Sequence, residues 1–292
     1  MNRWILGARP RTLPAAVVPV AVGAACAVGE GERIVWWRIV AAAVVALALQ
    51  VATNYANDYS DGVKGTDTVR VGPTRLVAGG LATPGAVKRA ACAMFGVAAA
   101  AGGALALAVG PELLVVGAAA IAAGWFYTGG STPYGYYGFG ELFVFVFFGV
   151  VATVGTTYVL LERVTALSSA LSVAVGFLAC SLLVVNNLRD IPTDTVAGKR
   201  TLAVRLGDRM TRRLYGLLIA GAAVVIVIVA AVAGRAAIAL GTLGPLLVGA
   251  SAVRAVLAGA RGPALIPVLG RTGRTQLVTG ALLVVGLLLS AG

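Results

Sequence analysis

The feature that most constrains this chain is a series of long apolar runs. Each extends over roughly 18–24 residues, the length that an α-helix needs to cross about 30 Å of hydrocarbon. The composition agrees, because 59% of the residues are hydrophobic and 12% are charged, against about 25% charged in ordinary soluble domains. A chain in lipid must satisfy its backbone hydrogen bonds internally, which a helix does within one segment. The sequence therefore predicts an all-α membrane protein with a single transmembrane domain over residues 1–292.

Nine of these runs are candidate membrane spans. They cover residues 10–29, 34–57, 86–109, 111–129, 139–161, 165–188, 212–234, 236–257 and 273–292. The first begins near Pro10 and is longer than the apolar part of a cleavable signal peptide. Several are rich in Ala, Gly and Val, and small residues let helices approach closely in lipid. We therefore expect a bundle of nine transmembrane helices.

The basic residues are unevenly divided between the two sides that these spans define. Of the 23 lysines and arginines, all but Arg33, Arg38, Arg163 and Arg235 fall on the side of the N-terminus. Loops rich in Lys and Arg face the cytoplasm, so we expect a multi-pass protein of the cell membrane with a cytoplasmic N-terminus. The net charge of +12 then reflects topology, and we expect no nucleic-acid partner.

Histidine is absent and cysteine is scarce, which excludes several kinds of site. Without His the chain cannot build a Ser-His-Asp or Cys-His catalytic group, nor an imidazole zinc site. Cys26, Cys92 and Cys180 lie far apart inside apolar runs, so we expect small buried side chains and no disulfide framework.

The aspartates are confined to two loops on the predicted cytoplasmic side. Residues 54–67 follow the second span and residues 186–200 follow the sixth. In each segment an amide is followed four residues later by an aspartate, then by a second aspartate, a glycine and a basic residue. Spacings of three and four place side chains on one face of a helix, although Pro192 is expected to distort the second helix. The repeat predicts duplicated halves whose aspartates face each other at the mouth of one cavity.

Oxygen ligands of this kind favour a hard cation. Mg²⁺ binds through one or two carboxylates together with water and substrate phosphates, and four nearby carboxylates would repel one another without cations. Basic residues beside them are suited to contact phosphate oxygens. Asp and Asn often merely cap helix ends, but two matching segments in a chain with so few charges favour a magnesium–diphosphate site.

At these residues the sequence resembles the UbiA superfamily of intramembrane prenyltransferases. Asn54-x3-Asp58-x2-Asp61 is similar to its first aspartate motif, and Asp190-x3-Asp194 to its second. Further stretches resemble, in order, the branch that prenylates 1,4-dihydroxy-2-naphthoate in menaquinone biosynthesis. These stretches are residues 8–14, 57–67, 72–76, 127–130, 138–142 and 186–202. Residues 131–134 depart from the pattern of that branch.

The resemblance implies a central cavity in which Mg²⁺ holds a polyprenyl diphosphate, with the active site facing the cytoplasm. Transfer of the chain to the aromatic acceptor would release diphosphate and CO₂ and give demethylmenaquinone. The implied Mg²⁺ ligands and catalytic residues are Asp58, Asp61, Asp190 and Asp194. The candidate substrate contacts are Asn54, Lys64, Arg75, Tyr127, Asn187, Lys199 and Arg200, with Arg9 and Arg11 added by resemblance alone.

Aromatic residues gather beside the predicted site. Tyr127, Tyr134, Tyr136, Tyr137 and Phe139 share one uncharged loop. They either cap the cavity, where aromatic faces stabilise a cation, or form an interfacial belt, and Tyr127 is the best functional candidate among them. The run of Phe143, Phe145, Phe147 and Phe148 favours lipid contact or helix packing.

Other functions remain open on the sequence. A transporter also carries intramembrane charges and repeated halves, but here the acids lie at one membrane face. The stretch Asp58-x2-Asp61-Gly62 superficially resembles the opening of a motif in phosphatidyl-transferring enzymes that use CDP-alcohols, yet its partner aspartates follow much later. Within the family, the acceptor could instead be 4-hydroxybenzoate, homogentisate or haem.

Overall fold

The computed structural model describes residues 2–31, 34–66 and 74–291, and all the regular secondary structure within them is helical. The α-helices are α1 (Arg3–Ala8), α2 (Pro14–Val28), α3 (Trp36–Lys64), α4 (Pro84–Ala108), α5 (Glu112–Phe126), α6 (Gly140–Val144), α7 (Ala152–Leu161), α8 (Ala166–Val196), α9 (Leu202–Val232), α10 (Ala250–Leu257) and α11 (Leu265–Leu289). Short 3₁₀ turns are η1 (Pro10–Thr12), η2 (Tyr134–Tyr137), η4 (Ala236–Thr242) and η6 (Gly262–Ala264). Two segments are π-helical, η3 (Phe145–Val151) and η5 (Gly244–Gly249).

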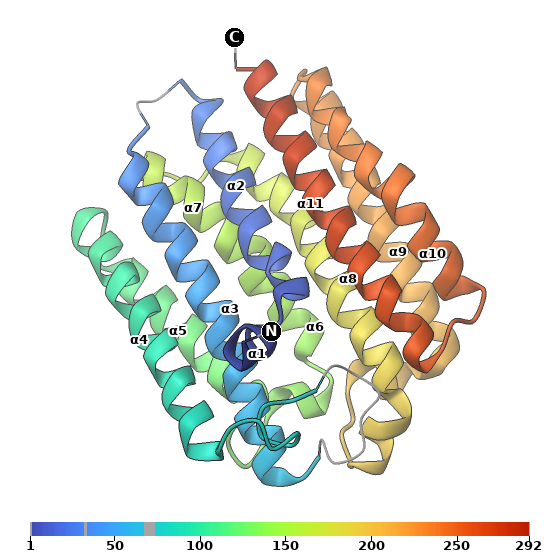
Figure 1. The fold of residues 1–292 in the computed structure, drawn as a ribbon. Coiled ribbons are helices and arrows are strands. Elements are labelled where there is room, and N and C mark those ends of the chain that lie inside the picture. The colour runs from blue at the N-terminus through green and yellow to red at the C-terminus, as the bar shows by residue number, and fades with distance from the viewer. Residues whose placement is uncertain (1, 32–33, 67–73, 292) are drawn as a thin grey trace.

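The long helices run side by side in one bundle (Figure 1). Within the described ranges, seven helical spans are long and apolar enough to cross a membrane. The N-terminal pair Arg3–Thr12 and Pro14–Val28, bent by 54°, brings this number to eight. The helix at the predicted span 111–129 is α5, which is apolar but has 15 residues. The chain is thus an all-helical membrane protein with seven or eight candidate spans, and the ninth crossing stays a prediction.

Four helices extend well beyond the spans predicted for them. At the N-terminal end, α9 begins at Leu202 and α11 at Leu265, whereas the predicted spans begin at residues 212 and 273. The second predicted span ends at residue 57 and the sixth at residue 188, whereas α3 reaches Lys64 and α8 reaches Val196. The α8 helix is unbroken at Pro192, where we expected a distortion. Polar residues at these ends face the protein interior rather than lipid, so the change in hydropathy does not mark the end of the helix. Both aspartate segments therefore begin on rigid helices.

The buried apolar residues form clusters on either side of α2. One cluster joins α2 to α8, α9, η4, α10 and α11. A second joins α2 to α3, α4 and α7, and a third lies between α3, α4 and Leu76. Figure 1 shows the corresponding arrangement, with α3, α4 and α5 on one side and α8 to α11 on the other. Leu76 lies at 0% exposure, so the loop after α3 is anchored to the bundle.

Two facing glycines allow η3 to lie directly against α8. A Cβ atom on Gly149 would stand 2.6 Å from the Cα of Gly176, which no side chain tolerates. Small residues at such crossings let backbones pack closely in lipid. Cys26 and Cys180 are buried as expected, but Cys92 on α4 is exposed, so the expectation of burial was wrong for Cys92. All three cysteines are free.

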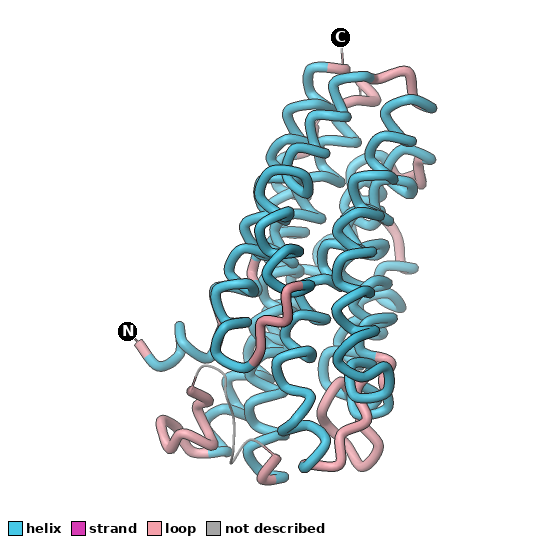
Figure 2. The backbone as a smooth tube through the Cα atoms, turned by 90° about the vertical axis from the view of Figure 1, so that its right-hand side faces the viewer, coloured by secondary structure: helices cyan, strands magenta, loops and turns pink. Residues whose placement is uncertain are grey.

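The tube in Figure 2 shows the bundle from its side, with most of the loops gathered at its two ends. One end carries the aspartate segments. At the opposite end, Arg38 donates to the carbonyl of Val159 at 2.9 Å and pairs with Glu162 at 2.9 Å. Arg163 pairs with Glu30 there at 3.4 Å. Of the four basic residues predicted on that side, Arg38 and Arg163 are thus paired with glutamates, Arg235 donates to the carbonyl of Gly29 at 3.2 Å, and Arg33 lies outside the described residues.

Candidate active site

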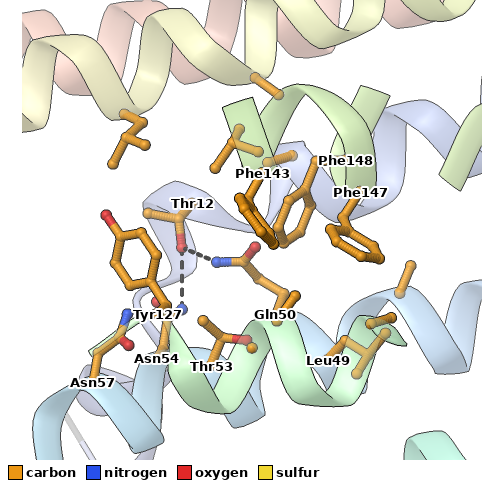
Figure 3. A pocket seen from close by; sticks show the side chains of 18 of the residues that line it. Thr12, Leu49, Gln50, Thr53, Asn54, Asn57, Tyr127, Phe143, Phe147 and Phe148 are labelled. Carbon is orange, nitrogen blue, oxygen red and sulfur yellow. Dashed lines mark hydrogen bonds between the residues drawn. The ribbon is translucent and has the colours of Figure 1, made fainter. Parts of the chain in front are cut away.

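A cavity of about 510 Å³ lies inside the bundle, within the usual range of small-molecule sites. Its wall is formed by residues of α2, α3, α4, α5, α8 and the continuous α6–η3–α7 segment, closed by the N-terminal turn. On α3 the lining residues recur every three or four positions from Ala42 to Asp61, the repeat that keeps side chains on one helix face. Figure 3 shows residues of this wall, with Leu49, Gln50 and Thr53 across from the phenylalanines.

Most of the predicted site residues line this cavity. They are Arg9, Arg11, Asn54, Asp58, Asp61, Arg75, Tyr127, Asn187, Asp190, Asp194 and Lys199. The two aspartate segments, distant in sequence, thus meet at one wall. Asp67, at the end of the first segment, lies outside the described residues.

Lys64 and Arg200 do not line the cavity. The Nζ atom of Lys64 donates to the carbonyls of Thr128 at 2.8 Å and Gly130 at 3.1 Å, so it anchors the loop after α5. The side chain of Arg200 is exposed, and its backbone N–H donates to the carbonyl of Tyr136 at 2.8 Å. Neither side chain lines the cavity in this arrangement, and the diphosphate contact predicted for each stays a prediction.

Asp58 is buried, at 1% exposure, and it holds the loop that follows α3. One carboxylate oxygen accepts the backbone N–H of Leu76 at 2.9 Å and the other accepts that of Val77 at 3.0 Å. Each carboxylate oxygen offers two acceptor positions. Asp58 can therefore fix this loop and still present oxygen lone pairs to the cavity that it lines.

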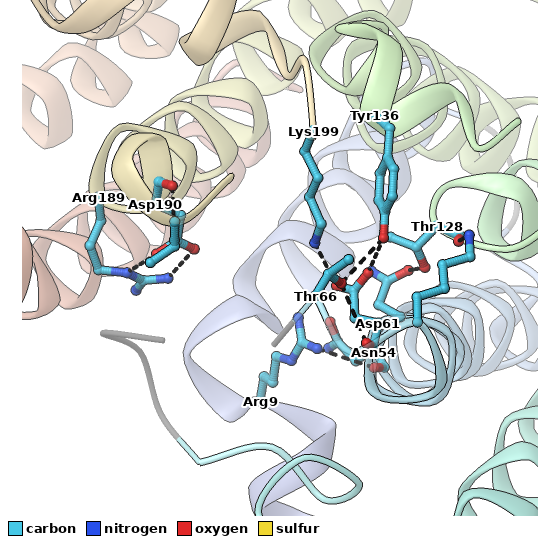
Figure 4. A network of polar contacts seen from close by, with 12 residues as sticks. Arg9, Asn54, Asp61, Thr66, Thr128, Tyr136, Arg189, Asp190 and Lys199 are labelled. Carbon is cyan, nitrogen blue, oxygen red and sulfur yellow. Dashed lines mark hydrogen bonds and ion pairs between the residues drawn. The ribbon is translucent and has the colours of Figure 1, made fainter. Parts of the chain in front are cut away.

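Asp61 joins the two aspartate segments. Its carboxylate accepts a hydrogen bond from the hydroxyl of Tyr136 at 2.6 Å and pairs with Nζ of Lys199 at 3.2 Å. Lys199 also lies over the Tyr136 ring, 4.8 Å from its centroid, and all three side chains come together in Figure 4. Because Lys199 follows α8 and Asp61 ends α3, this buried pair connects the two halves of the cavity mouth.

On α8, Asp190 has a basic partner in its neighbour. Arg189 donates through two nitrogens to the two oxygens of Asp190, each at 2.7 Å, and also to the side chain of Asn186 at 2.8 Å. Figure 4 shows this pair set apart from the group around Asp61. Arg189 is 3% exposed. The sequence reading passed over Arg189, although a basic residue directly before the motif aspartate was a visible signal.

The carboxylate oxygens of the cavity wall are of the type that Mg²⁺ prefers as ligands. Among the described residues, no three Asp, Glu or Cys side chains converge closely enough to hold one metal ion. Mg²⁺ does not need such a cluster, since it usually takes one or two carboxylates and completes its shell with water and phosphate oxygens. The wall offers carboxylates on both α3 and α8 for that purpose, and the basic side chains of Lys199 and Arg189 now balance two of them.

The N-terminal turn closes the cavity over α3. The hydroxyl of Thr12 accepts hydrogen bonds from the amides of Gln50 at 3.1 Å and Asn54 at 3.2 Å (Figure 3). The amide of Asn54 also donates to the carbonyl of Ala8 at 2.9 Å, and Arg9 donates to the backbone carbonyl of Asn54 at 3.3 Å. Arg9 has a left-handed backbone, with φ of 53°. Asn54 therefore positions the segment that brings Arg9 and Arg11 to the wall.

A buried carboxylate stands behind Asn187. Glu141, at 8% exposure, accepts the side-chain N–H of Asn187 at 3.0 Å through one oxygen. Its other oxygen has no hydrogen-bond partner among the described residues. The sequence reading did not select Glu141, because a lone acid at the start of a span resembles an ordinary helix end.

The aromatic residues face the cavity more than we predicted. Phe143, Phe147 and Phe148 line it, so the expectation of lipid contact was wrong for these three, but the alternative of packing is met by Phe143, whose ring lies 6.1 Å from that of Phe147. Packing also holds for Phe145, whose ring packs 5.8 Å from that of Phe177. A run made only of phenylalanine and valine, such as residues 143–148, has no polar residue to mark its inner face, so the sequence could not show which side chains face the cavity.

The loop aromatics are divided between the wall and the surface. Tyr134 and Tyr136 line the cavity beside Tyr127, whereas Tyr137 and Phe139 are exposed. Tyr134 stacks on Phe143 with ring centroids 4.0 Å apart, and its hydroxyl donates to the carbonyl of Ala123 at 2.8 Å. Burial raises the pKa of the Tyr134 phenol above its ordinary value, so this residue stays protonated and neutral.

Known proteins resemble this chain in sequence and fold. The model of the UbiA prenyltransferase family matches residues 16–264. The chain is 52% identical to a 1,4-dihydroxy-2-naphthoate octaprenyltransferase of Mycobacterium tuberculosis, over 94% of this chain and 93% of that protein. Identity to the protein so named in Mycobacterium leprae is 50%, over 99% and 97%. The solved structure of a UbiA homolog from Archaeoglobus fulgidus bound to DMAPP and Mg²⁺ superimposes with a TM-score of 0.68 at 15% identity, covering 97% of this chain and 99% of that one. The chain belongs to the UbiA prenyltransferase family.

Proposed function

We propose that this chain transfers a polyprenyl group from a polyprenyl diphosphate to 1,4-dihydroxy-2-naphthoate, a step of menaquinone biosynthesis. Diphosphate and CO₂ are released, and the product is a demethylmenaquinol, the reduced form of a demethylmenaquinone. The observation that carries the proposal is the cavity wall, where four aspartates and four basic residues at the mouth give way to apolar and aromatic side chains inside. The naming of the two mycobacterial relatives at 52% and 50% identity supports this acceptor.

The mouth of the cavity suits the diphosphate end of the donor. Asp58, Asp61, Asp190 and Asp194 would hold Mg²⁺, which when bound supplies positive charge to the leaving diphosphate. Lys199, Arg75, Arg9 and Arg11 line the same region, and charge-assisted hydrogen bonds from such groups to phosphate oxygens are strong. The breaking C–O bond leaves its electron pair on the diphosphate, which these side chains stabilise.

The inner wall suits an electron-poor allylic carbon. Tyr127, Tyr134, Phe143 and Phe147 line the cavity, and aromatic rings attract cations. An apolar wall also excludes water, which would otherwise capture the cation. The ring carbon that carries the acceptor's carboxylate forms the new C–C bond, and the electron pair of the departing CO₂ restores the aromatic ring.

Asn187 is the side chain best placed to orient the acceptor. It lines the cavity on α8, above Asp190, and Glu141 fixes its amide. With its N–H held by Glu141, the amide oxygen is oriented to accept a hydrogen bond from a hydroxyl group of the acceptor. We further propose that this mouth faces the cytoplasm, which the uneven distribution of Lys and Arg supports.

The test is prenyl transfer by the purified protein in detergent, with 1,4-dihydroxy-2-naphthoate, octaprenyl diphosphate and Mg²⁺. Asp61→Asn and Asp190→Asn should abolish product, and EDTA should do the same. Asp208→Asn is the matched control, because Asp208 pairs with Arg212 at 2.7 Å on α9 and does not line the cavity. If product formed with 4-hydroxybenzoate and not with 1,4-dihydroxy-2-naphthoate, 4-hydroxybenzoate would replace the proposed acceptor. No transfer to any aromatic acceptor by a folded sample would overturn the proposal.

A further inference from the structure

Glycines form part of the cavity wall far from the aspartates. Gly102 of α4, Gly117 of α5 and Gly155 of α7 all line the cavity. A Cβ atom built on Gly117 or Gly155 would meet no atom within 4 Å, and one on Gly102 would meet only Val45, at 3.8 Å. These positions differ from Gly149, where a neighbouring backbone fills the space. Here the missing side chains leave open volume.

The glycines lie deep along the axis of the bundle. Ala42 and Asp58 of α3 both line the cavity, and sixteen residues of helix separate them by roughly 24 Å. Gly117 precedes Tyr127 by ten residues on α5, about 15 Å. Gly155 follows Phe143 by twelve residues along α6–η3–α7, about 18 Å. Both glycines are therefore well beyond the region where the allylic bond would break.

The wall around them offers nothing polar enough to hold a charged group. The neighbouring lining residues are Val45, Ala46, Val116, Ala120, Val151 and Thr156, and every charged residue of the wall lies at the mouth. The hydroxyl of Thr156 donates to the carbonyl of Ala152 in its own helix at 2.7 Å. Only an apolar ligand segment is compatible with such a surface, because an unpaired polar group would be costly to bury there. A prenyl chain has this character along its whole length.

We propose that Gly117 and Gly155 keep the inner channel open for the distal isoprene units of the donor and thereby determine how long a donor the protein accepts. The inference rests on the proposed prenyl transfer. It assigns the width of the channel to two positions on different helices, α5 and α7. A large side chain at either position fills the channel without displacing a packed helix, since its Cβ atom points into open volume.

The experiment compares Gly117→Leu and Gly155→Leu with Gly103→Leu. Gly103 adjoins Gly102 on α4, a Cβ atom on it also meets nothing within 4 Å, and it does not line the cavity. All three changes replace a helical glycine by leucine, so their effects on helix propensity match. Each variant is assayed with geranyl diphosphate, which has two isoprene units, and with octaprenyl diphosphate, which has eight.

We expect the ratio of kcat/KM for the long donor to that for the short donor to fall at least about ten-fold in Gly117→Leu and Gly155→Leu, since pocket fit is worth that much per misplaced group. Gly103→Leu should keep the wild-type ratio. A wild-type ratio in all three variants would show that the prenyl chain of the donor leaves the cavity before it reaches the glycines, and it would overturn the inference.

Failure of the proposed function has a different signature, because wild-type protein would then transfer neither donor. If the leucine variants do not fold, Gly117→Ala and Gly155→Ala decide the matter. They should lower the ratio by a smaller factor, and an unchanged ratio in both alanine variants would count against the inference.

Discussion

At the residue scale, the two aspartates at the end of α3 share one motif but have different partners. Asp58 binds backbone N–H groups of Leu76 and Val77, whereas Asp61 binds the side chains of Lys199 and Tyr136. The contacts of Asp58 hold a loop in place, whereas those of Asp61 neutralise a buried lysine. Substitutions of the two aspartates should therefore have different effects on stability even if both abolish transfer.

Asp61 and Lys199 should show strong coupling in a double-mutant cycle. Asp61→Asn alone leaves Lys199, 6% exposed, without its carboxylate, and a buried unpaired charge is strongly destabilising. Lys199→Met removes that charge, so the double variant should be about 1–3 kcal/mol more stable than the sum of the single effects predicts. Unfolding in detergent measures this. Asp58→Asn with Lys199→Met serves as the comparison, and equal coupling in both cycles would contradict the assignment of Lys199 to Asp61.

Glu141 should act on the acceptor through Asn187. Glu141→Ala removes the oxygen that accepts the Asn187 amide at 3.0 Å, which leaves a buried N–H unpaired at a cost of about 1–3 kcal/mol. We expect KM for the aromatic acceptor to rise roughly ten-fold with little change in KM for the diphosphate. Glu141→Gln keeps an accepting oxygen, so its KM for the aromatic acceptor should stay close to that of the wild-type protein. Equal rises in both KM values would indicate a general structural role instead.

At the element scale, the close packing of η3 against α8 is the contact most sensitive to volume. Gly149→Val would place side-chain atoms into the backbone at Gly176, only 2.6 Å from the first carbon added. Overpacking of this kind costs about 1–3 kcal/mol or more, so thermal unfolding should begin at a clearly lower temperature. Gly103→Val on α4 is the control, because its side chain meets no neighbour. Equal unfolding temperatures would mean that the two segments separate readily.

Hydropathy predicted most helices well because the bilayer imposes one length on every span. The segments 139–161 and 236–257 agree with structural spans at 140–161 and 236–257. Hydropathy failed where a helix turns its polar face to protein, as at the ends of α3 and α8. It also could not rank the phenylalanines of η3, since lipid and a prenyl-type cavity are equally apolar environments.

The site was predictable where the chemistry is local and unpredictable where the partner is distant. Spacing alone placed Asp58 and Asp61, or Asp190 and Asp194, on one helix face, and all four line the cavity. No pattern indicated that Asp58 would bind the backbone of Leu76, or that Glu141 would reach Asn187 from another helix. Such contacts depend on how helices dock, which a single sequence does not encode in any short spacing.

At the scale of the whole molecule, the division of charge depends on α5. With 15 residues, this helix is about 22 Å long, shorter than the roughly 30 Å of hydrocarbon. If α5 crosses, the aspartates and most basic residues share the cytoplasmic face. If it does not, every later loop changes side, and the two aspartate segments would lie on opposite faces. The structure brings both segments to one cavity, which favours a crossing.

Single cysteines on either side of α5 should therefore react from opposite faces of the membrane. Pro111 and Ser131 are both exposed, before and after the helix. Each is changed to Cys in a chain whose native thiols are removed by Cys26→Ala, Cys92→Ser and Cys180→Ala. An impermeant maleimide added to right-side-out vesicles should label Pro111→Cys at once and Ser131→Cys only after permeabilisation, because we propose that the mouth of the cavity faces the cytoplasm. Retained prenyl transfer verifies that each variant is folded. Labelling of both from one face would exclude a crossing by α5, and labelling in the reverse order would keep nine crossings but invert the orientation.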